Sequence, residues 1–341
     1  MFLFTILFWL IGALLIYLFV FDHKIHYRIK IIDLLYRFLL FKTVDFSSST
    51  IERKFESYLP VIKSDTANGV KSEKIQVEHD GVPITLYVYK PLGLGEKETV
   101  PCMIHYHGGG LIVFHPNNRV EDHPSREICR RTNCVVVSVD YSLAPENKWP
   151  KQIDESYAAF KWVLESEHEM LKNVDLEKVY LSGSSAGANL ATLVTFKARE
   201  NNLVSAIKAL CVFYPWFYVH PLVDSRQKNE WTYLTYGNFV DWAEHCTFGD
   251  KRDSAMKDPK VCPMLNESFK DLPPVCIVSG SRDMLKDEAL LFKKKLKNDN
   301  IPVTCKVFPN ATHESLGLEW LKSTVLQFDY IEDFLKTHDL I

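Results

Sequence analysis

Short apolar segments that alternate with longer helical ones constrain the fold of this 341-residue chain most strongly. The apolar segments are VPCMIHYH, CVVVSVDY, KVYLSG, ALCVFYPW, PPVCIVSG and VTCKVFP. Helical periodicity occurs at residues 119–132, 152–167, from Ala186 onward, 285–298 and 318–336. Strands without polar alternation are buried on both faces, which requires helices on each side of a parallel sheet. The sequence therefore predicts an α/β fold with a mostly parallel central sheet.

Two segments depart from this alternation. KIQVEHDGVPITLYVYKP contains two alternating runs around HDG, a pattern typical of a β-hairpin. Residues 217–270 lie between two predicted strands and are rich in aromatic side chains. A connection of this length usually carries secondary structure of its own. We therefore predict a helical cap insertion at about 217–270 within a catalytic domain of residues 71–341.

The first 21 residues, MFLFTILFWLIGALLIYLFVF, contain no charged side chain. As a helix rising about 1.5 Å per residue they span roughly 30 Å, enough to cross the core of a bilayer. A cleaved signal peptide would show a basic N-terminal region, a shorter apolar core and a small-residue cleavage site, and none is evident. Residues 1–21 are therefore predicted to be a retained transmembrane signal anchor in contact with the lipid bilayer.

Residues 22–70 are predicted to form juxtamembrane and cap helices. The stretch IIDLLYRFLLF within them suits a helix that lies on the membrane, covers a site or packs on the core. The positive-inside rule places the catalytic domain in the cytosol, because five basic residues follow the anchor: Lys24, Arg28, Lys30, Arg37 and Lys42. The sequons at Asn266 and Asn310 would suit a luminal domain, but roughly one or two arise by chance in such a chain.

Composition excludes two classes of function. The net charge is −3, and no basic tract is interleaved with aromatic residues, so a nucleic-acid partner is not expected. The eight cysteines are scattered without a C-x-x-C pair, which argues against a zinc site or a redox motif. Several lie in apolar runs, where cysteine serves as a small buried hydrophobe. Their disulfide state depends on the membrane topology.

A serine between two glycines is the first candidate for chemistry. Ser185 stands in GSSAG, between Gly183 and Gly187. The bare pattern G-x-S-x-G occurs in roughly one chain in ten of this size. Here it follows the apolar run VYLSG and opens a helix of small residues, AGANLATL, which is the strand, turn and helix of a nucleophile elbow. The glycines leave room for a strained turn that projects the serine. Ser185 is the predicted nucleophile.

The tetrad HGGG at 107–110 is the more specific motif; chance would produce it in well under roughly 1% of such chains. Consecutive glycines expose backbone N–H groups without obstruction, and acyl transfer needs such donors where the oxyanion forms. We predict the N–H groups of Gly108, Gly109 and Ala186 as the oxyanion hole. His107 and Gly110 are predicted to support this loop.

A serine hydroxyl needs a base, and the base needs a carboxylate to orient it. The chain order of these hydrolases is serine, acid, histidine, which excludes as base His105, His107, His115 and His123. Of the later histidines, His313 follows the last predicted strand, whereas His338 lies three residues from the C-terminus. We predict His313 as the base.

The acid should follow a strand that lies between the serine and the base in the sequence. Asp283 comes immediately after PPVCIVSGSR, and Asp287 comes four residues later. Asp287 suits the first turn of the next helix, where a carboxylate interacts well with the helix dipole. Asp283 is therefore the predicted acid.

Four blocks resemble, in order, those of the hormone-sensitive-lipase-like esterases of the α/β-hydrolase superfamily. They are HGGG at 107–110, DYSLAPENKWPKQIDESYAAFKWV at 140–163, GSSAGANLA at 183–191 and GSRDMLKDEALLF at 280–292. The resemblance spans about 75–340. With its anchor, the chain is most similar to the arylacetamide deacetylase branch, whose members are single-pass esterases of the endoplasmic reticulum membrane.

The resemblance implies a membrane-anchored serine esterase that cleaves small apolar esters, lipids or amides with Ser185, Asp283 and His313. It also implies a helical cap over an apolar acyl pocket, a luminal domain, and neither metal nor organic cofactor. Two other functions stay open: an apolar-ligand receptor on the same scaffold, and a lipid-tethered scaffold with an inert pocket. The plant hormone receptor of this fold lacks the catalytic histidine, so His313 favours an enzyme.

Two positions depart from the family pattern. Ser184 stands before the nucleophile, where the family usually has aspartate. Glu314 follows His313, where a glycine and an aromatic residue are common. We expect altered packing or pH response at the elbow and altered geometry in the histidine loop.

Overall fold

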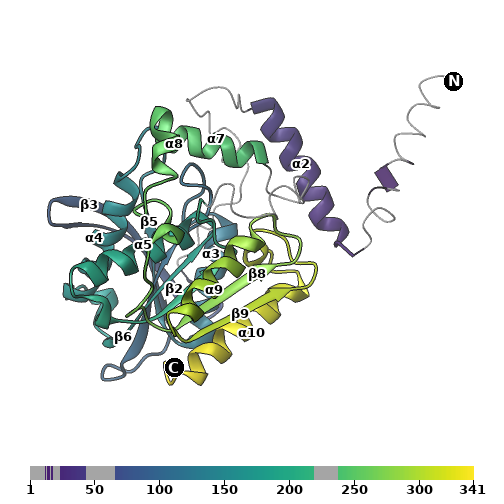
Figure 1. Ribbon diagram of the computed structural model, residues 1–341. Helices are drawn as coiled ribbons and strands as arrows, with labels where there is room; N and C mark the ends of the chain where they lie inside the picture. The colour runs from purple at the N-terminus through teal and green to yellow at the C-terminus, as the bar shows by residue number, and fades with distance from the viewer. Residues whose placement is uncertain (1–11, 13, 16, 18–23, 44–65, 219–236) are drawn as a thin grey trace.

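The predicted sheet extends through the whole catalytic domain. A computed structural model describes residues 12, 14–15, 17, 24–43, 66–218 and 237–341. Within these residues, nine strands form one sheet in the order β1-β2-β3-β5-β4-β6-β7-β8-β9 (Figure 1). The strands are β1 (Thr66–Ala67), β2 (Val70–His79), β3 (Val82–Pro91), β4 (Val100–Tyr106), β5 (Val135–Asp140), β6 (Val174–Ser184), β7 (Ile207–Phe213), β8 (Val275–Gly280) and β9 (Val303–Phe308).

Strand direction divides the sheet into two parts. The pairs from β5 through β4, β6, β7 and β8 to β9 are all parallel, whereas β1, β2 and β3 join antiparallel. In the β2–β3 hairpin His79 pairs with Val82, and the turn residues Asp80 and Gly81 have φ of 51° and 75°. Positive φ at both turn positions matches the twist of the flanking strands. The mostly parallel sheet and the hairpin are both confirmed.

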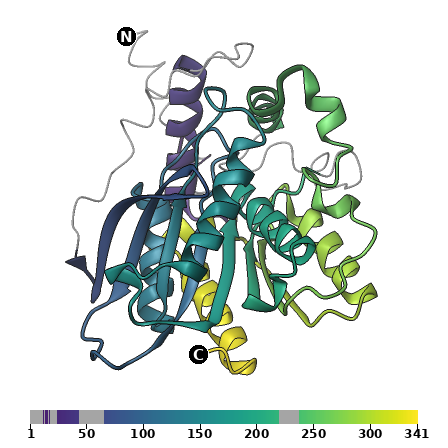
Figure 2. The same cartoon turned by 90° about the vertical axis from the view of Figure 1, so that its left-hand side faces the viewer.

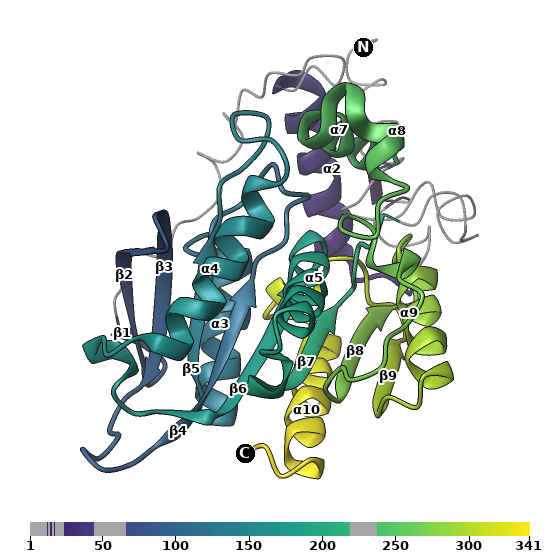
Figure 3. The same ribbon diagram turned by 60° about the vertical axis from the view of Figure 1, so that its left-hand side comes forward.

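Helices cover both faces of the sheet, as predicted (Figure 3). One face packs against α4 (Lys151–Glu165), α5 (Ala186–Glu200) and α9 (Lys286–Asn298), and the other against α3 (Arg119–Thr132) and α10 (Lys322–Thr337). Strand β5 contributes side chains to the hydrophobic cores on both faces of the sheet. Val135, Val137 and Val139 belong to the core that includes α4 and α5, and Val136 belongs to the core that includes α3 and α10.

The last helix starts later than its sequence pattern indicates. The pattern predicts a helix from residue 318, but α10 begins at Lys322 because residues Ser315–Gly317 form a separate 3₁₀ turn, η7. The Thr324 hydroxyl donates to the carbonyl oxygens of Ser315 and Leu318 at 2.6 and 2.9 Å. These bonds hold the preceding segment in a tight non-helical path next to the histidine loop.

The predicted cap insertion contains two short helices. They are α7 (Gly237–Phe248) and α8 (Arg252–Ala255); residues 219–236 of the insertion lie outside the described residues. Both helices lie at the same end of the molecule as α2 (Tyr27–Thr43), opposite the C-terminus (Figure 2). Trp242 and Ala243 of α7 are buried in the core that includes α4 and α5. Helix α7 is therefore packed onto the catalytic domain.

The predicted anchor, residues 1–21, lies outside the described residues except at positions 12, 14, 15 and 17. Within the described ranges, no helix has the length and apolar character needed to cross a bilayer. The stretch IIDLLYRFLLF belongs to α2. Ile25 and Ile29 form one buried cluster with Leu318 and Leu321, so α2 packs on the domain beside the segment that follows η7.

All eight cysteines are free of disulfide bonds, and all except Cys305 are buried. Burial raises the pKa of the Cys134 thiol to about 12, which keeps it protonated and unreactive. The interpretation of these residues as small buried hydrophobes is confirmed for the seven buried positions.

Candidate active site

Ser185 occupies a strained turn between β6 and α5. Its φ is 53° and its ψ is −118°, a conformation that costs a non-glycine residue free energy and persists only when neighbours impose it. The Ser185 N–H donates to the carbonyl oxygen of Phe213 at 2.9 Å, and its own carbonyl oxygen accepts the Trp216 N–H at 3.1 Å. The turn therefore projects the hydroxyl beyond the carboxyl end of the strand.

Two glycines make this turn possible. A Cβ atom at Gly183 would lie 2.2 Å from the carbonyl oxygen of Gly187. At Gly187 it would lie 2.0 Å from the carbonyl oxygen of Tyr106. Both contacts are with backbone atoms, which cannot move aside, so no larger residue fits between the elbow and β4.

The structure brings the three predicted triad residues into one line. The Ser185 hydroxyl lies 2.8 Å from His313 Nε2, and His313 Nδ1 lies 2.9 Å from Asp283 Oδ2. All three residues are at most 3% exposed. The other oxygen of Asp283 accepts the Leu285 N–H at 2.8 Å. With Nδ1–H held by the carboxylate, Nε2 is free to accept the serine proton.

Asp287 and His338, the alternative candidates for the acid and the base, lie away from Ser185. Asp287 is in the first turn of α9 and forms an ion pair with Lys286 at 3.9 Å. His338 Nδ1 lies 2.9 Å from the carbonyl oxygen of Phe334, at the end of α10. The structure thus brings Asp283 and His313 to Ser185, and it places Asp287 and His338 on other partners.

The environment of His313 favours its charged form. Burial acts to lower the pKa of His313, but the charge and hydrogen bond of Asp283 outweigh it, so the pKa is raised above its ordinary value. The Tyr214 ring packs edge-on against the imidazole, with centroids 5.0 Å apart and planes at 63°. The imidazole is thus fixed in orientation and able to hold a proton during the reaction.

One of the three predicted oxyanion donors is already occupied. The Gly108 N–H donates to Glu121 Oε1 of α3 at 3.0 Å, so its assignment to the oxyanion hole is wrong. Among the described residues, no acceptor is found for the N–H groups of Gly109, Gly110 and Ala186. Gly110, predicted only to support the loop, therefore replaces Gly108 as a candidate donor.

The residues around the glycine loop hold it in shape. Gly109 has a φ of 97°, and a Cβ there would lie 2.1 Å from the Val113 carbonyl oxygen. His107 Nδ1 lies 2.8 Å from the Gly108 carbonyl oxygen and donates to it. Burial lowers the pKa of His107 to about 4. His107 is therefore a neutral imidazole that orients the loop, the role predicted for it.

Apolar cap residues cover the loop. A Cβ at Gly110 would lie 3.0 Å from the Trp216 ring, 3.2 Å from Ala243 and 3.4 Å from the Phe239 ring. Trp216 follows β7, and the other two belong to α7. Aromatic and aliphatic side chains therefore cover the carboxyl end of the sheet, where Ser185 lies.

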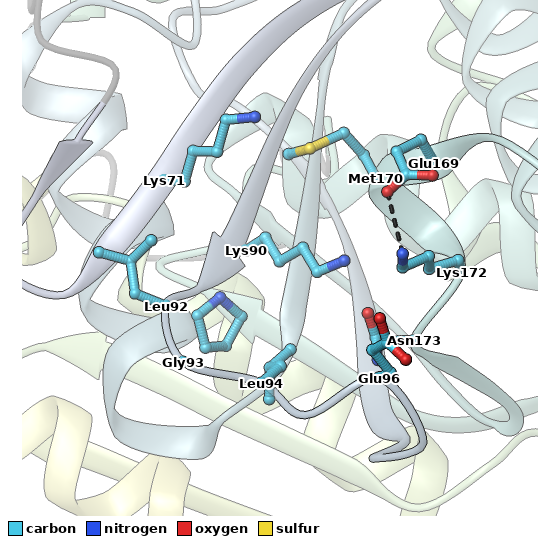
Figure 4. Close-up of a pocket in the computed structure, with 11 residues that line it drawn as sticks. Lys71, Lys90, Leu92, Gly93, Leu94, Glu96, Glu169, Met170, Lys172 and Asn173 are labelled. Carbon is cyan, nitrogen blue, oxygen red and sulfur yellow. Dashed lines mark ion pairs between the residues drawn. The ribbon is translucent and has the colours of Figure 1, made fainter.

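A cavity lies at the opposite end of the sheet. About 300 Å³ in volume, it is lined by Lys71, Lys90 and Asn173 among others (Figure 4). Asn173 directly precedes β6, and Lys71 of β2 pairs with Lys90 of β3, whereas Ser185 follows the C-terminal end of β6. Ligands of open α/β sheets bind at the carboxyl ends of the strands, so this cavity is separate from the catalytic centre.

The sequence reasoning missed two carboxyl groups beside the glycine loop, one buried and one partly buried. Glu121 reaches the glycine loop from α3, and Glu314 lies directly after His313 with a φ of 56°. No motif marks Glu121. Glu314 stands out only because it replaces a residue type common after the base. Within the described residues, no group of three or more His, Cys, Asp or Glu side chains is suited to a metal ion.

A serine, a histidine and an aspartate in hydrogen-bonding line at the carboxyl end of a parallel sheet define a serine hydrolase. Residues 103–316 match a family model described as alpha/beta hydrolase fold. The chain belongs to this α/β-hydrolase family.

The chain is similar to an arylesterase of Saccharolobus solfataricus, with 26% identity over 296 residues, or 86% of this chain and 90% of the relative. An acetyl esterase of Salmonella dublin is 28% identical over 239 residues, which cover 68% of this chain and 69% of the relative. Among solved structures, a hyperthermophilic esterase from Pyrobaculum calidifontis matches with a TM-score of 0.74. That match has 25% identity and covers 90% of this chain and 98% of the other.

Proposed function

We propose that this chain is a serine carboxylester hydrolase that works through an acyl-enzyme on Ser185. The observation that carries the proposal is the pair of hydrogen-bond distances that link Ser185, His313 and Asp283, 2.8 and 2.9 Å. The similarity to an arylesterase and to an acetyl esterase supports the same reaction class.

The geometry assigns each atom a step. His313 Nε2 takes the proton as Ser185 Oγ forms a bond to the ester carbonyl carbon. The resulting oxyanion accepts hydrogen bonds from the N–H groups of Gly109, Gly110 and Ala186. His313 then returns the proton to the alkoxide as the C–O bond of the ester breaks and the alcohol leaves. Water attacks the acyl-enzyme by the same route in reverse and releases the acid.

The proposed substrates are small apolar acyl or aryl esters. The aromatic and aliphatic side chains that cover Gly110 would exclude water from the reacting carbonyl and receive an apolar acyl group. This assignment agrees with the arylacetamide deacetylase branch, and it leaves amides as the second class to be tested.

We also propose that residues 1–21 anchor the enzyme in the endoplasmic reticulum membrane. The absence of charge in this segment supports an anchor. Helix α2 supports a membrane-facing surface next to it, because Ile31, Ile32, Leu34 and Leu35 are each more than a third exposed while Ile29 is buried. Apolar side chains that face outward beside a basic segment are typical of helices at a bilayer surface.

Partition and glycosylation test the membrane proposal. The full chain should stay with membranes after alkaline carbonate extraction, and a chain that lacks residues 1–21 should be released. Asn310 is exposed on the described surface, so a glycosidase-sensitive mass shift that disappears in Asn310→Gln would place the domain in the lumen. Release of the full chain by carbonate would contradict the anchor.

Ser185→Ala tests the catalytic proposal. The full chain should hydrolyse p-nitrophenyl esters of graded acyl length and react with a fluorophosphonate probe, and both activities should be lost in the variant. Ser254→Ala, on the surface of α8, is the control. A Ser185→Ala protein that is still labelled at the full level would disprove the assignment. Tight binding of esters by a wild-type chain without turnover or labelling would instead indicate a receptor.

A further inference from the structure

Two glutamates from different elements meet at Gly108. Glu121 lies in the first turn of α3, and Glu314 lies between His313 and η7. A Cβ built on Gly108 would be 3.0 Å from Glu314 Oε1 and 3.1 Å from Glu121 Oε1, so these oxygens are at most about 6 Å apart. The φ of Gly108 is not positive. A methyl group at this position would press on both carboxyl groups.

Histidines are the basic groups nearest to this pair. Glu121 Oε1 accepts the Gly108 N–H, and its Oε2 lies 3.9 Å from His105 Nε2. Glu314 Oε1 lies 3.7 Å from His313 Nε2. Within the described residues, no lysine or arginine forms an ion pair with either carboxyl group, and Oε2 of each has no hydrogen-bond partner.

Such a pair is unfavourable with two negative charges. The Glu121 side chain is 1% exposed and that of Glu314 is 13% exposed, and two nearby buried carboxylates repel each other strongly. Burial and the charge of Glu121 raise the pKa of Glu314 to about 8, although His313 acts in the opposite direction. Glu314 is therefore the member that carries a proton at neutral pH.

Two further groups act on Glu314 in opposite directions: the charge of Asp283 raises its pKa, and the hydrogen bond from the Tyr214 hydroxyl lowers it. Burial raises the pKa of Tyr141 and of Tyr214 well above the ordinary value, so both hydroxyls stay neutral, and His107 is neutral as well. The titratable groups that act on the pair from the surrounding elements are His105, His107, Tyr141, Tyr214, Asp283 and His313.

We propose that Glu121 and Glu314 carry one proton between them at neutral pH and act as a positioning pair, which fixes the glycine loop through Gly108 and keeps a second negative charge away from the oxyanion. The inference rests on the proposed ester hydrolysis at Ser185. When the shared proton leaves, a second carboxylate lies beside Gly108 and His313, and its charge opposes the formation of the oxyanion. Turnover should therefore fall at alkaline pH.

Glutamine at position 314 has nearly the same shape as the protonated glutamic acid, and it cannot ionise. The wild-type kcat should fall about tenfold per pH unit above the ionisation of Glu314, as for a single essential proton. Glu314→Gln should keep the wild-type kcat near pH 7 and lose the alkaline fall, with the acid limb in place. Glu319→Gln, whose side chain pairs with Arg119 of α3 at the surface, is the matched control.

Glu121→Gln separates a coupled pair from a single acid. This variant retains an oxygen to accept the Gly108 N–H but removes the charge that holds the proton on Glu314. Its alkaline fall should begin at lower pH than in the wild type, and the double variant should show no fall. Two results would overturn the proposal: an acid limb that moves to lower pH in Glu314→Gln, which means that Glu314 is ionised throughout, or an unchanged alkaline limb.

Nuclear magnetic resonance tests the shared proton without turnover. In the full chain labelled with ¹³C at glutamate Cδ, one carboxyl resonance should titrate near 8, and it should vanish in Glu314→Gln but persist in Glu319→Gln. If it titrates but esters are not hydrolysed, the proposed function fails while the proton pair stands. If esters are hydrolysed and no such resonance exists, the pair is disproved alone.

Discussion

The Tyr141 hydroxyl donates to the carbonyl oxygen of His107 at 2.7 Å, and the two rings stack with centroids 4.1 Å apart and planes within 4°. One buried side chain on the loop after β5 thus holds the residue that opens the glycine loop. The position of the candidate oxyanion donors depends on this contact as well as on the glycines themselves.

Tyr141→Phe should weaken catalysis more than binding. The change keeps the stacked ring and leaves the His107 carbonyl oxygen buried without its donor, which costs about 1–3 kcal/mol of folding stability. We expect kcat to fall while KM changes little, because the loop acts on the transition state. Urea unfolding and steady-state kinetics measure the two effects. Tyr330→Phe, on α10, is the control. An unchanged kcat in Tyr141→Phe would show that the Tyr141 hydroxyl does not position the glycine loop for catalysis.

Gly187→Ala should prevent the elbow from forming. Its Cβ would lie 2.0 Å from the Tyr106 carbonyl oxygen and 2.3 Å from that of His107, and neither backbone can retreat from the centre of the sheet. We expect little soluble protein and no fluorophosphonate labelling. Gly95→Ala places a methyl group no closer than 3.9 Å to Glu98 and should behave as wild type. Full labelling of Gly187→Ala would show that the elbow is looser than described.

The acid limb of kcat/KM should lie above the ordinary histidine pKa of 6.5. Only neutral His313 accepts the serine proton, so activity is lost as pH falls through the His313 pKa, which is raised. Asp283→Asn removes the charge that raises this pKa and disturbs the tautomer, so kcat should drop by about 10⁴ and the limb should move to lower pH. A pH titration of both proteins provides the measurement. A limb that stays in place would mean that Asp283 does not set the pKa.

The two sides of α2 should respond differently to substitution. Ile29 is 1% exposed and clusters with Leu318 and Leu321, so Ile29→Ala should destabilise the chain by about 2–5 kcal/mol, as for other buried aliphatic truncations. Leu35 is 56% exposed, and Leu35→Ser should leave unfolding unchanged. In a chain that lacks residues 1–21, Leu35→Ser should also reduce binding to phospholipid vesicles. Equal vesicle binding with and without the substitution would rule out α2 as a membrane surface.

The sequence predicted the sheet, the hairpin and the position of the triad because each depends on local pattern and chain order. Ser185, Asp283 and His313 each follow a strand, and parallel strands bring their carboxyl ends to one edge of the sheet. Gly183 and Gly187 could be predicted for a similar reason, since a turn that tight excludes a Cβ atom.

The missed features depend on side chains that meet across the fold. Gly108 does not have its predicted role because its N–H donates to the carboxylate of Glu121, which lies 13 residues later in α3. No local pattern shows which carbonyl or carboxylate accepts a given loop N–H. The late start of α10 likewise follows from the Thr324 hydroxyl, whose two acceptors lie in the preceding turn.

The cluster of Ile25, Ile29, Leu318 and Leu321 joins the N-terminal helix to the stretch of chain that carries the catalytic base. Because Ile29 of α2 lies against Leu318 and Leu321, the packing of this helix and the path of the chain that follows His313 depend on each other. A substitution that loosens α2 therefore acts first on the segment next to the catalytic base and only then on the sheet.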